Sequence, residues 1–209
     1  MEGALQGSLL DVADEIVVGP LAGATRRVEL GRGAWLDVRP HWITGADELF
    51  ARLVDRLPWR EERRRMYDRV VDVPRLLCGY RKGEALPDPI LAAARERLSA
   101  HYAEELGEPF TSLGMCLYRD GRDSVAWHGD RFGRGSSQDT MVAILSLGAP
   151  RTLALRPRGG GPVRRHEVGH GDLVVMGGTC QRTFDHAVPK TARPVGPRIS
   201  AQFRPHNVG

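Results

Sequence analysis

The sequence contains few cysteines, and this shortage excludes a protein built on disulfides. Only three cysteines occur among 209 residues, Cys78, Cys116 and Cys180, and they are widely spaced without a C-x-x-C pair. An odd number of scattered cysteines does not form a disulfide framework and fits the reducing environment of the cytoplasm. We therefore expect a cytoplasmic protein in which each thiol is a small buried apolar residue.

Long hydrophobic runs are also missing. No apolar stretch approaches the ~18 residues that a membrane-spanning helix needs, so no membrane partner is expected. The N-terminal stretch MEGALQGSLLDVADE is acidic and lacks the basic start and long apolar core of a signal peptide. Export is therefore not expected.

The excess of one charge sign is small. The net charge is +4, which permits a polyanionic partner without requiring one. Hydrophobic residues make up 41% of the chain and charged residues 27%, as in soluble globular domains. The chain is long enough for one domain with a substantial core and too short for two ordinary domains. We expect a single domain over residues 1–209, present as a monomer.

Hydrophobic periodicity divides the chain into a helical, loop-rich front, about residues 1–110, and a strand-rich back, about 111–209. Helical spacing of apolar residues within 46–59 and 87–106 predicts two amphipathic helices. After Phe110 the pattern changes to short runs separated by Gly, Pro and Asp, which is typical of an antiparallel sandwich or barrel. The expected fold class is therefore α+β. The strand candidates lie at 111–118, 124–128, 140–148, 152–157, 163–178, 186–190 and 198–204.

An arginine-rich segment, residues 60–82, separates the two predicted helices. Its basic side chains alternate with Tyr67 and Tyr80, a mixture that proteins use to hold phosphates and to stack on bases. A solvated, arginine-rich helix end is the alternative interpretation of the same segment.

The stretch AWHGD places His128 and Asp130 two residues apart after a run with strand character. On a strand these two side chains point to one face, while Trp127 and Gly129 point to the other, so Trp127 is expected to pack. Iron(II) enzymes that activate oxygen use two histidines and one carboxylate on one side of the metal. The pattern indicates half of such a site, although an isolated H-x-D motif arises easily by chance.

A second histidine must come from further along the chain. His186 is the best candidate because it lies in a short strand-like run, FDHAVPK, after a strand and a turn. His170 lies in a glycine-rich turn, where a hydrogen-bonding role is the expected alternative, and His206 lies close to the C-terminus. His166 is a further candidate.

Two arginines near the C-terminus indicate an anionic ligand. Arg198 and Arg204 are six residues apart, an even number, so on a strand both face the same way. A guanidinium forms paired hydrogen bonds with a carboxylate, and two on one face suit a dicarboxylate.

The chain resembles the AlkB family of 2-oxoglutarate- and Fe(II)-dependent dioxygenases. The resemblance is carried by H-x-D, a distant histidine and R-x5-R, which lie within LYRDGRDSVAWHGD, HAVPK and PRISAQFR. PRLLCGY, SLGAPRTLALR and HGDLVVMGG follow in family order, so the resemblance covers roughly Pro74 to the C-terminus. It implies a double-stranded β-helix (jelly roll) core, N-terminal buttressing helices, and a nucleotide-recognition lid near residues 60–85.

The resemblance also implies roles for individual residues. His128, Asp130 and His186 would hold Fe(II), and a second group of residues would form the 2-oxoglutarate pocket. Many relatives carry asparagine where this chain has Cys116 and Ser200, so two amide contacts to 2-oxoglutarate would be lost or replaced. The pocket residues are Tyr118, Arg198, Arg204, Ser200 and Cys116.

The implied activity is oxidative removal of alkyl groups from bases of the 1-methyladenine and 3-methylcytosine type in DNA or RNA. It consumes 2-oxoglutarate and O2 and releases formaldehyde, succinate and CO2. The alternative within the same fold is a dioxygenase that acts on a protein or on a modified tRNA base. A binding module without catalysis would leave the two arginines, Arg198 and Arg204, unexplained.

Three residues are predicted to contact the flipped base or its strand, Tyr80, Arg75 and Phe132. Tyr80 and the His128 ring are expected to stack on the base, which offsets the cost of removing it from its helix. Phe132 stands where many relatives carry an acidic residue, so it either lines the pocket or turns into the core. In the second case another residue contacts the base, for example Asp123 or Asp139.

Overall fold

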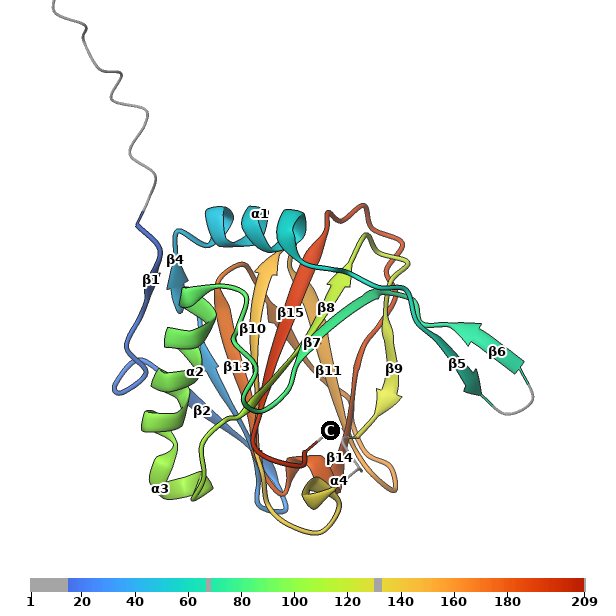
Figure 1. Ribbon diagram of the computed structural model, residues 1–209. Coiled ribbons are helices and arrows are strands. Elements are labelled where there is room, and N and C mark those ends of the chain that lie inside the picture. Colours follow the sequence, from blue (N-terminus) through green and yellow to red (C-terminus); the bar gives the residue numbers. More distant parts are fainter. Residues whose placement is uncertain (1–14, 67–68, 130–132, 209) are drawn as a thin grey trace, which may run out of the picture.

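The computed structural model describes residues 15–66, 69–129 and 133–208, and its body consists of two antiparallel β-sheets with helices on one outer face (Figure 1). Within this part of the chain, no helix is long and apolar enough to cross a membrane. The larger sheet has seven strands, in the order β2 (Arg26–Gly31), β3 (Ala34–Arg39), β13 (Asp172–Gly178), β10 (Val142–Gly148), β15 (Arg198–Arg204), β8 (Ser112–Tyr118) and β7 (Leu76–Tyr80).

The smaller sheet has four strands and carries the histidines of interest. Its order is β12 (Arg164–Val168), β11 (Arg151–Pro157), β14 (Phe184–Val188) and β9 (Val125–His128). Two short ribbons complete the strands, β1 (Val17–Val18) with β4 (Ile43–Thr44), and β5 (Arg63–Met66) with β6 (Arg69–Asp72). All the pairings are antiparallel, which confirms the predicted jelly-roll fold.

Alternation along the strands gives the large sheet two buried faces. On β10, Ala143, Leu145 and Leu147 pack in the core beneath the helices. Val142 and Ile144 point the other way and join the core between the sheets. Successive strand residues face opposite sides, so a polar residue on the inner face looks into the space between the sheets.

The two main helices form where the periodicity predicted them. In α1 (Ala46–Arg56), Ala46, Leu49 and Leu53 are buried, and the helix ends just before Pro58. The second helix, α2 (Pro89–His101), begins with proline in its first turn, and Asp88 caps it by accepting a hydrogen bond from the Ile90 amide. Two single turns, α3 (Ala103–Leu106) and α4 (Cys180–Thr183), and the 3-10 turn η1 (Arg134–Ser136) are also present.

The front of the chain is less helical than expected. The strands β2 and β3 extend the large sheet, with β3 paired to β13, although these residues were expected to be helical or loop. Charged residues on β2, such as Arg26 and Glu29, hide its alternation because an edge strand leaves most of its side chains in solvent.

The described part of residues 60–82 is also mainly extended rather than a helix end, and Tyr67 lies outside the described residues. They form the β5–β6 hairpin, which projects from the body of the protein, followed by β7 (Figure 1). The alternative interpretation of this segment as a solvated helix end is therefore wrong. The interpretation as a lid is compatible with a projecting hairpin.

Candidate active site

Two histidines from neighbouring strands form the centre of the candidate site. His128 at the end of β9 lies directly opposite His186 on β14, and their ring centroids are 4.2 Å apart. The His128 Nδ1 atom lies 2.9 Å from the Ala126 carbonyl oxygen, which suits an Nδ1–H donor and leaves Nε2 for a metal. His186 is buried, with 8% of its surface exposed.

The predicted carboxylate ligand, Asp130, lies outside the described residues, and so does Phe132. Within the described ranges, no group of three His, Cys, Asp or Glu residues is placed to hold a metal. The structure therefore brings together the two predicted histidine ligands, and the third ligand remains a prediction.

The other histidines lie elsewhere. His170 accepts a hydrogen bond at Nδ1 from the Gly148 amide, 2.7 Å away, and its Nε2 lies 3.3 Å from Asp47. It has the hydrogen-bonding role expected of a histidine in a glycine-rich turn. His166 lies on β12, which β11 and β14 separate from β9, and His206 is exposed beyond β15.

Arg198 is a buried cation with an unused donor. Only 3% of its surface is exposed, its Nε donates to Ser146 Oγ at 2.9 Å, and its Nη1 has no hydrogen-bond partner among the described residues. Burial lowers the pKa of this guanidinium, and the nearby Tyr118 acts in the opposite direction. A buried N–H group without a partner is costly, and a bound carboxylate would satisfy it. The site thus fits a 2-oxoglutarate carboxylate.

Tyr118 lies opposite Arg198 in the pairing of β8 with β15. Its ring lies 5.2 Å from the Arg198 guanidinium and 5.5 Å from that of Arg151. Burial raises the pKa of the Tyr118 phenol well above its ordinary value, so the group stays neutral and can donate a hydrogen bond. Tyr118 packs in one apolar cluster with Val125 and Val188, which lie on the same two strands as the histidines.

Two residues of the predicted cosubstrate pocket face each other next to this pair. Cys116 on β8 lies opposite Ser200 on β15. The carboxamide of Gln202 lies between them, and its Nε2 donates to Ser200 Oγ at 2.7 Å and contacts the Cys116 sulfur at 3.7 Å. Sequence reasoning missed Gln202, although its even spacing from Arg198 places it on the same face of β15.

Arg204 lies at the opposite end of β15 from Arg198, away from the Arg198–Tyr118 pair. It lines a cavity of about 770 Å³ together with Tyr80, Cys78 and Arg60. Burial and the neighbouring Cys78 raise the pKa of Tyr80 to about 12, which keeps its phenol neutral. The structure therefore places Arg204 beside a predicted base-stacking residue rather than in the Arg198 cluster.

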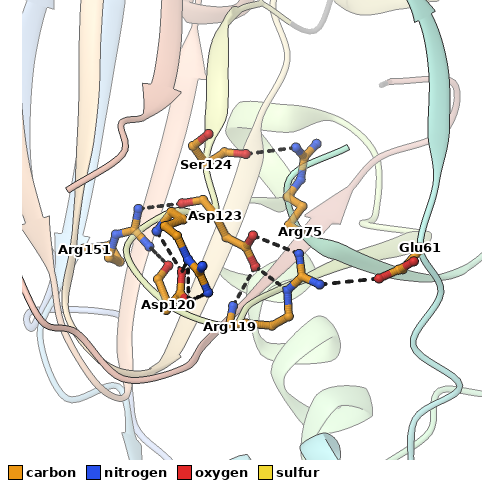
Figure 2. A network of polar contacts seen from close by, with 8 residues as sticks. Glu61, Arg75, Arg119, Asp120, Asp123, Ser124 and Arg151 are labelled. Carbon is orange, nitrogen blue, oxygen red and sulfur yellow. Dashed lines mark hydrogen bonds and ion pairs between the residues drawn. The ribbon is translucent and has the colours of Figure 1, made fainter. Parts of the chain in front are cut away.

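Arg75 reaches from the start of β7 toward the predicted pocket. Its Nε lies 3.4 Å from the Cys116 sulfur, and its Nη1 donates to the Ser124 carbonyl oxygen at 3.1 Å (Figure 2). Arg75 therefore connects the cosubstrate residues to the segment that leads into β9.

A polar network fixes residues 119–124, which connect Tyr118 to β9 (Figure 2). The buried Asp123 carboxylate accepts hydrogen bonds from the Arg119 amide at 2.8 Å and Nε at 2.9 Å, and Arg119 reaches Glu61 beside the hairpin at 3.5 Å. Arg151 donates to the carbonyl oxygens of Asp123 and Asp120. Side chains from three separate segments thus position the strand that carries His128.

The network also bears on which acidic residue contacts the base. Burial alone would raise the pKa of Asp123, but the hydrogen bonds from Arg119 outweigh it, and the pKa lies below its ordinary value. Asp139 is paired with Arg182. Both carboxylates therefore already have cationic partners.

Trp127 packs against Arg156, as expected for a packing residue. The Arg156 guanidinium carbon lies 4.3 Å from the centroid of the Trp127 ring.

Comparisons with known proteins agree with this geometry. The profile of the 2OG-Fe(II) oxygenase superfamily matches residues 39–204. The human alpha-ketoglutarate-dependent dioxygenase alkB homolog 3 is 32% identical over 183 residues, which cover 78% of this chain and 62% of the relative. The Arabidopsis thaliana DNA oxidative demethylase ALKBH2 is 26% identical over 226 residues, which cover 88% and 70%. The chain spans about three fifths of the human relative's length.

Solved structures share the fold. That of OsALKBH1 superposes with a TM-score of 0.60 at 12% identity and covers 85% of this chain and 100% of that chain. A prolyl-4-hydroxylase from Pseudomonas putida gives 0.53 at 20% identity and covers 82% and 93%.

The fold and the matched profile define the class: the chain belongs to the 2OG-Fe(II) oxygenase superfamily. Within it, the chain is a member of the AlkB family, which confirms the resemblance drawn from the sequence motifs. Membership implies Fe(II) as the metal, with 2-oxoglutarate and O2 as cosubstrates.

Proposed function

We propose that this chain is a dioxygenase that removes small alkyl groups from nucleobases of the 1-methyladenine and 3-methylcytosine type in DNA or RNA, acting as a cytoplasmic monomer. The observation that carries the proposal is the pairing of His128 with His186 across β9 and β14. The Arabidopsis thaliana relative is a DNA oxidative demethylase, which supports the substrate class.

The residues of the candidate site have three roles: metal binding, cosubstrate binding and base binding. His128, His186 and the predicted ligand Asp130 hold the metal. Bound iron and 2-oxoglutarate supply the oxidation of the alkyl group by O2, with release of formaldehyde, succinate and CO2.

The second task is to hold and orient the cosubstrate. The free Nη1 of Arg198 binds a carboxylate of 2-oxoglutarate, and the neutral Tyr118 phenol donates beside it. The Tyr118 phenol, whose pKa is raised by burial, does not have to gain or lose a proton when the cosubstrate binds.

The third task is to bind the base, and the cavity lined by Tyr80 and Arg204 serves it. A neutral phenol ring can stack on an extruded base, which offsets part of the cost of removing the base from its helix. Arg60, exposed beside the same cavity, supplies positive charge for a phosphate.

The alternative is a dioxygenase of the same fold that acts on a protein or a modified tRNA base. The prolyl-4-hydroxylase neighbour illustrates how widely the fold is used. The arginine-bearing hairpin and the cavity with Tyr80 favour a nucleic acid.

The test is formaldehyde release from oligonucleotides that carry 1-methyladenine or 3-methylcytosine, in the presence of Fe(II), ascorbate and 2-oxoglutarate. We expect release from DNA or RNA and none without 2-oxoglutarate. Turnover of 2-oxoglutarate with no repair of any methylated oligonucleotide would favour the protein or tRNA alternative.

A further inference from the structure

The glycine between the two predicted metal ligands of the H-x-D motif is in contact with an arginine from another strand. A Cβ atom built on Gly129 would lie 1.8 Å from Nη2 of Arg158 and 3.2 Å from the Gln181 carbonyl oxygen. No real Cβ approaches a nitrogen so closely, so any larger residue at this position would displace the guanidinium. A larger residue at position 129 therefore requires the Arg158 guanidinium to move.

The Arg158 guanidinium donates hydrogen bonds to three acceptors. Arg158 follows β11, and its Nη2 donates to the Gln181 carbonyl oxygen at 2.8 Å and its Nη1 to the Arg182 carbonyl oxygen at 2.7 Å. Its Nε donates to Asp185 Oδ1 at 3.0 Å. The guanidinium is thus bonded to α4 and to the residue before His186, and it cannot leave Gly129 without breaking these bonds.

The Arg158 side chain therefore contacts the sequence neighbour of each histidine. Arg158 contacts Gly129, the neighbour of His128, and it binds Asp185, the neighbour of His186. The strands β9 and β14 pair His128 with His186, and β9 ends at His128, so the ladder between them stops before Gly129. An external contact is needed where the strand ladder no longer fixes the separation of the two chains.

We propose that Arg158 is a positioning residue for the metal site, which sets the separation and orientation of His128 and His186 through Gly129 and Asp185. The inference rests on the proposed ligand set. Residues that orient metal ligands without touching the metal typically change metal affinity about 10–100-fold when they are replaced. We expect Arg158→Ala to weaken metal binding by about tenfold or more.

The experiment measures Mn(II) affinity of the full chain by electron paramagnetic resonance, and Co(II) absorption as a report of ligand geometry. Arg158→Ala should weaken Mn(II) binding and change the Co(II) spectrum, and Arg158→Lys should recover only part of the loss because it keeps the charge without the three-way hydrogen bonding. Arg165→Ala, an exposed arginine on β12, is the matched control and should leave both readouts unchanged.

Gly129→Ala tests the same contact from the other side, including the case in which Arg158→Ala fails to fold. Its methyl group should displace the guanidinium and weaken Mn(II) binding to a similar extent. The combined variant should be no worse than either single variant, because both remove one contact. Losses that add, or an unchanged Mn(II) affinity in either single variant, would overturn the role of Arg158.

His186→Ala distinguishes failure of the positioning role of Arg158 from failure of the proposed ligand set. Loss of Mn(II) binding in His186→Ala together with unchanged binding in Arg158→Ala rejects the positioning role alone. Full Mn(II) binding in His186→Ala rejects the proposed ligand set, and the inference about Arg158 falls with it.

Discussion

At a single residue, Arg198, a buried hydrogen-bond donor predicts a ligand. A guanidinium buried between two sheets loses its hydration, and burial is tolerated only when its donors find acceptors. Ser146 accepts from Nε, the Tyr118 ring lies against the group, and Nη1 has no partner in the part of the chain that the structure describes. A carboxylate at Nη1 would complete the set and restore charge balance.

Arg198→Lys tests this account of the pocket. Lysine keeps the positive charge but loses the planar fork, so the Kd for 2-oxoglutarate should rise about tenfold or more, a cost of ~1.4 kcal/mol or above. Calorimetric titration of the Mn(II)-loaded protein measures it. Arg165→Lys on the exposed side of β12 should leave the Kd unchanged, and an unchanged Kd in Arg198→Lys would remove that residue from the pocket.

Asp123 gives a prediction about acid stability. Its pKa is lower in the folded protein than the ordinary value of 3.8. The carboxylate therefore contributes stability above pH 3.8, and this contribution is lost as the pH falls through the lower folded-state pKa. Asp123→Asn should lower the free energy of unfolding at neutral pH by about 1–3 kcal/mol and should flatten its fall in acid.

Urea unfolding as a function of pH measures both effects of Asp123→Asn. Asp55→Asn on α1 serves as a control because it replaces an exposed carboxylate. Parallel acid curves for the wild type and Asp123→Asn would show that the hydrogen bonds from Arg119 do not stabilise the loop.

At the scale of the element, β15 arranges the inner face of the large sheet as a row. Alternate residues along it point the same way, from Arg198 through Ser200 and Gln202 to Arg204. The Cα atoms of the two arginines are about 20 Å apart along the strand at ~3.3 Å per residue, so Ser200 and Gln202 lie between the points from which the two arginine side chains extend. The neutral side chains between them therefore face the remainder of any ligand that Arg198 holds.

Gln202→Met tests this row. Methionine keeps the length of the side chain and removes its amide, so the Kd for 2-oxoglutarate should rise several-fold, in line with the loss of one hydrogen bond, about 0.5–1.5 kcal/mol. The measurement is the same titration. Equal Kd values for Gln202→Met and the wild type would leave the carboxamide as a packing group only.

The β5–β6 hairpin and Arg60, which precedes it, should bind nucleic acid through their positive charge. Arg60→Ala removes an exposed cation beside the Tyr80 cavity, so binding of single-stranded oligonucleotides should weaken for all sequences, and the salt dependence of log K should become less steep by about one unit. Fluorescence anisotropy at several salt concentrations measures this. Arg97→Ala, exposed on α2, should change neither quantity.

Elements with strong periodicity could be predicted, and elements that depend on partners could not. The helices α1 and α2 and the strands after Phe110 follow from the spacing of apolar residues. Most side chains of the edge strand β2 lie in solvent, and the hairpin sequence is rich in charged residues, so no hydrophobic pattern predicts either element.

The same distinction holds for the site. His128, His186 and Arg198 could be found because motif spacing on strands reflects which side chains share a face. Arg158 and Gln202 could not, because their importance comes from contacts with segments far away in the sequence, Gln181 to Asp185 for the first and Cys116 for the second. Such contacts follow from the folded register rather than from local spacing.

In the whole molecule, the two sheets carry different parts of the candidate site. The smaller sheet carries both histidines, the larger sheet carries the arginine and tyrosine of the cosubstrate pocket, and the loop 119–124 joins them. The helices pack on the outer face of the large sheet and leave the space between the sheets for the site.

The mass of a 1-methyladenine oligonucleotide after incubation with the protein, Fe(II) and 2-oxoglutarate tests the central claim most directly. We expect conversion to the unmodified mass by the wild type and by His170→Ala, whose histidine accepts a hydrogen bond from the Gly148 amide and lies 3.3 Å from Asp47. No conversion should occur with His186→Ala or without 2-oxoglutarate. Conversion by His186→Ala, or none by the wild type on any methylated DNA or RNA, would contradict it.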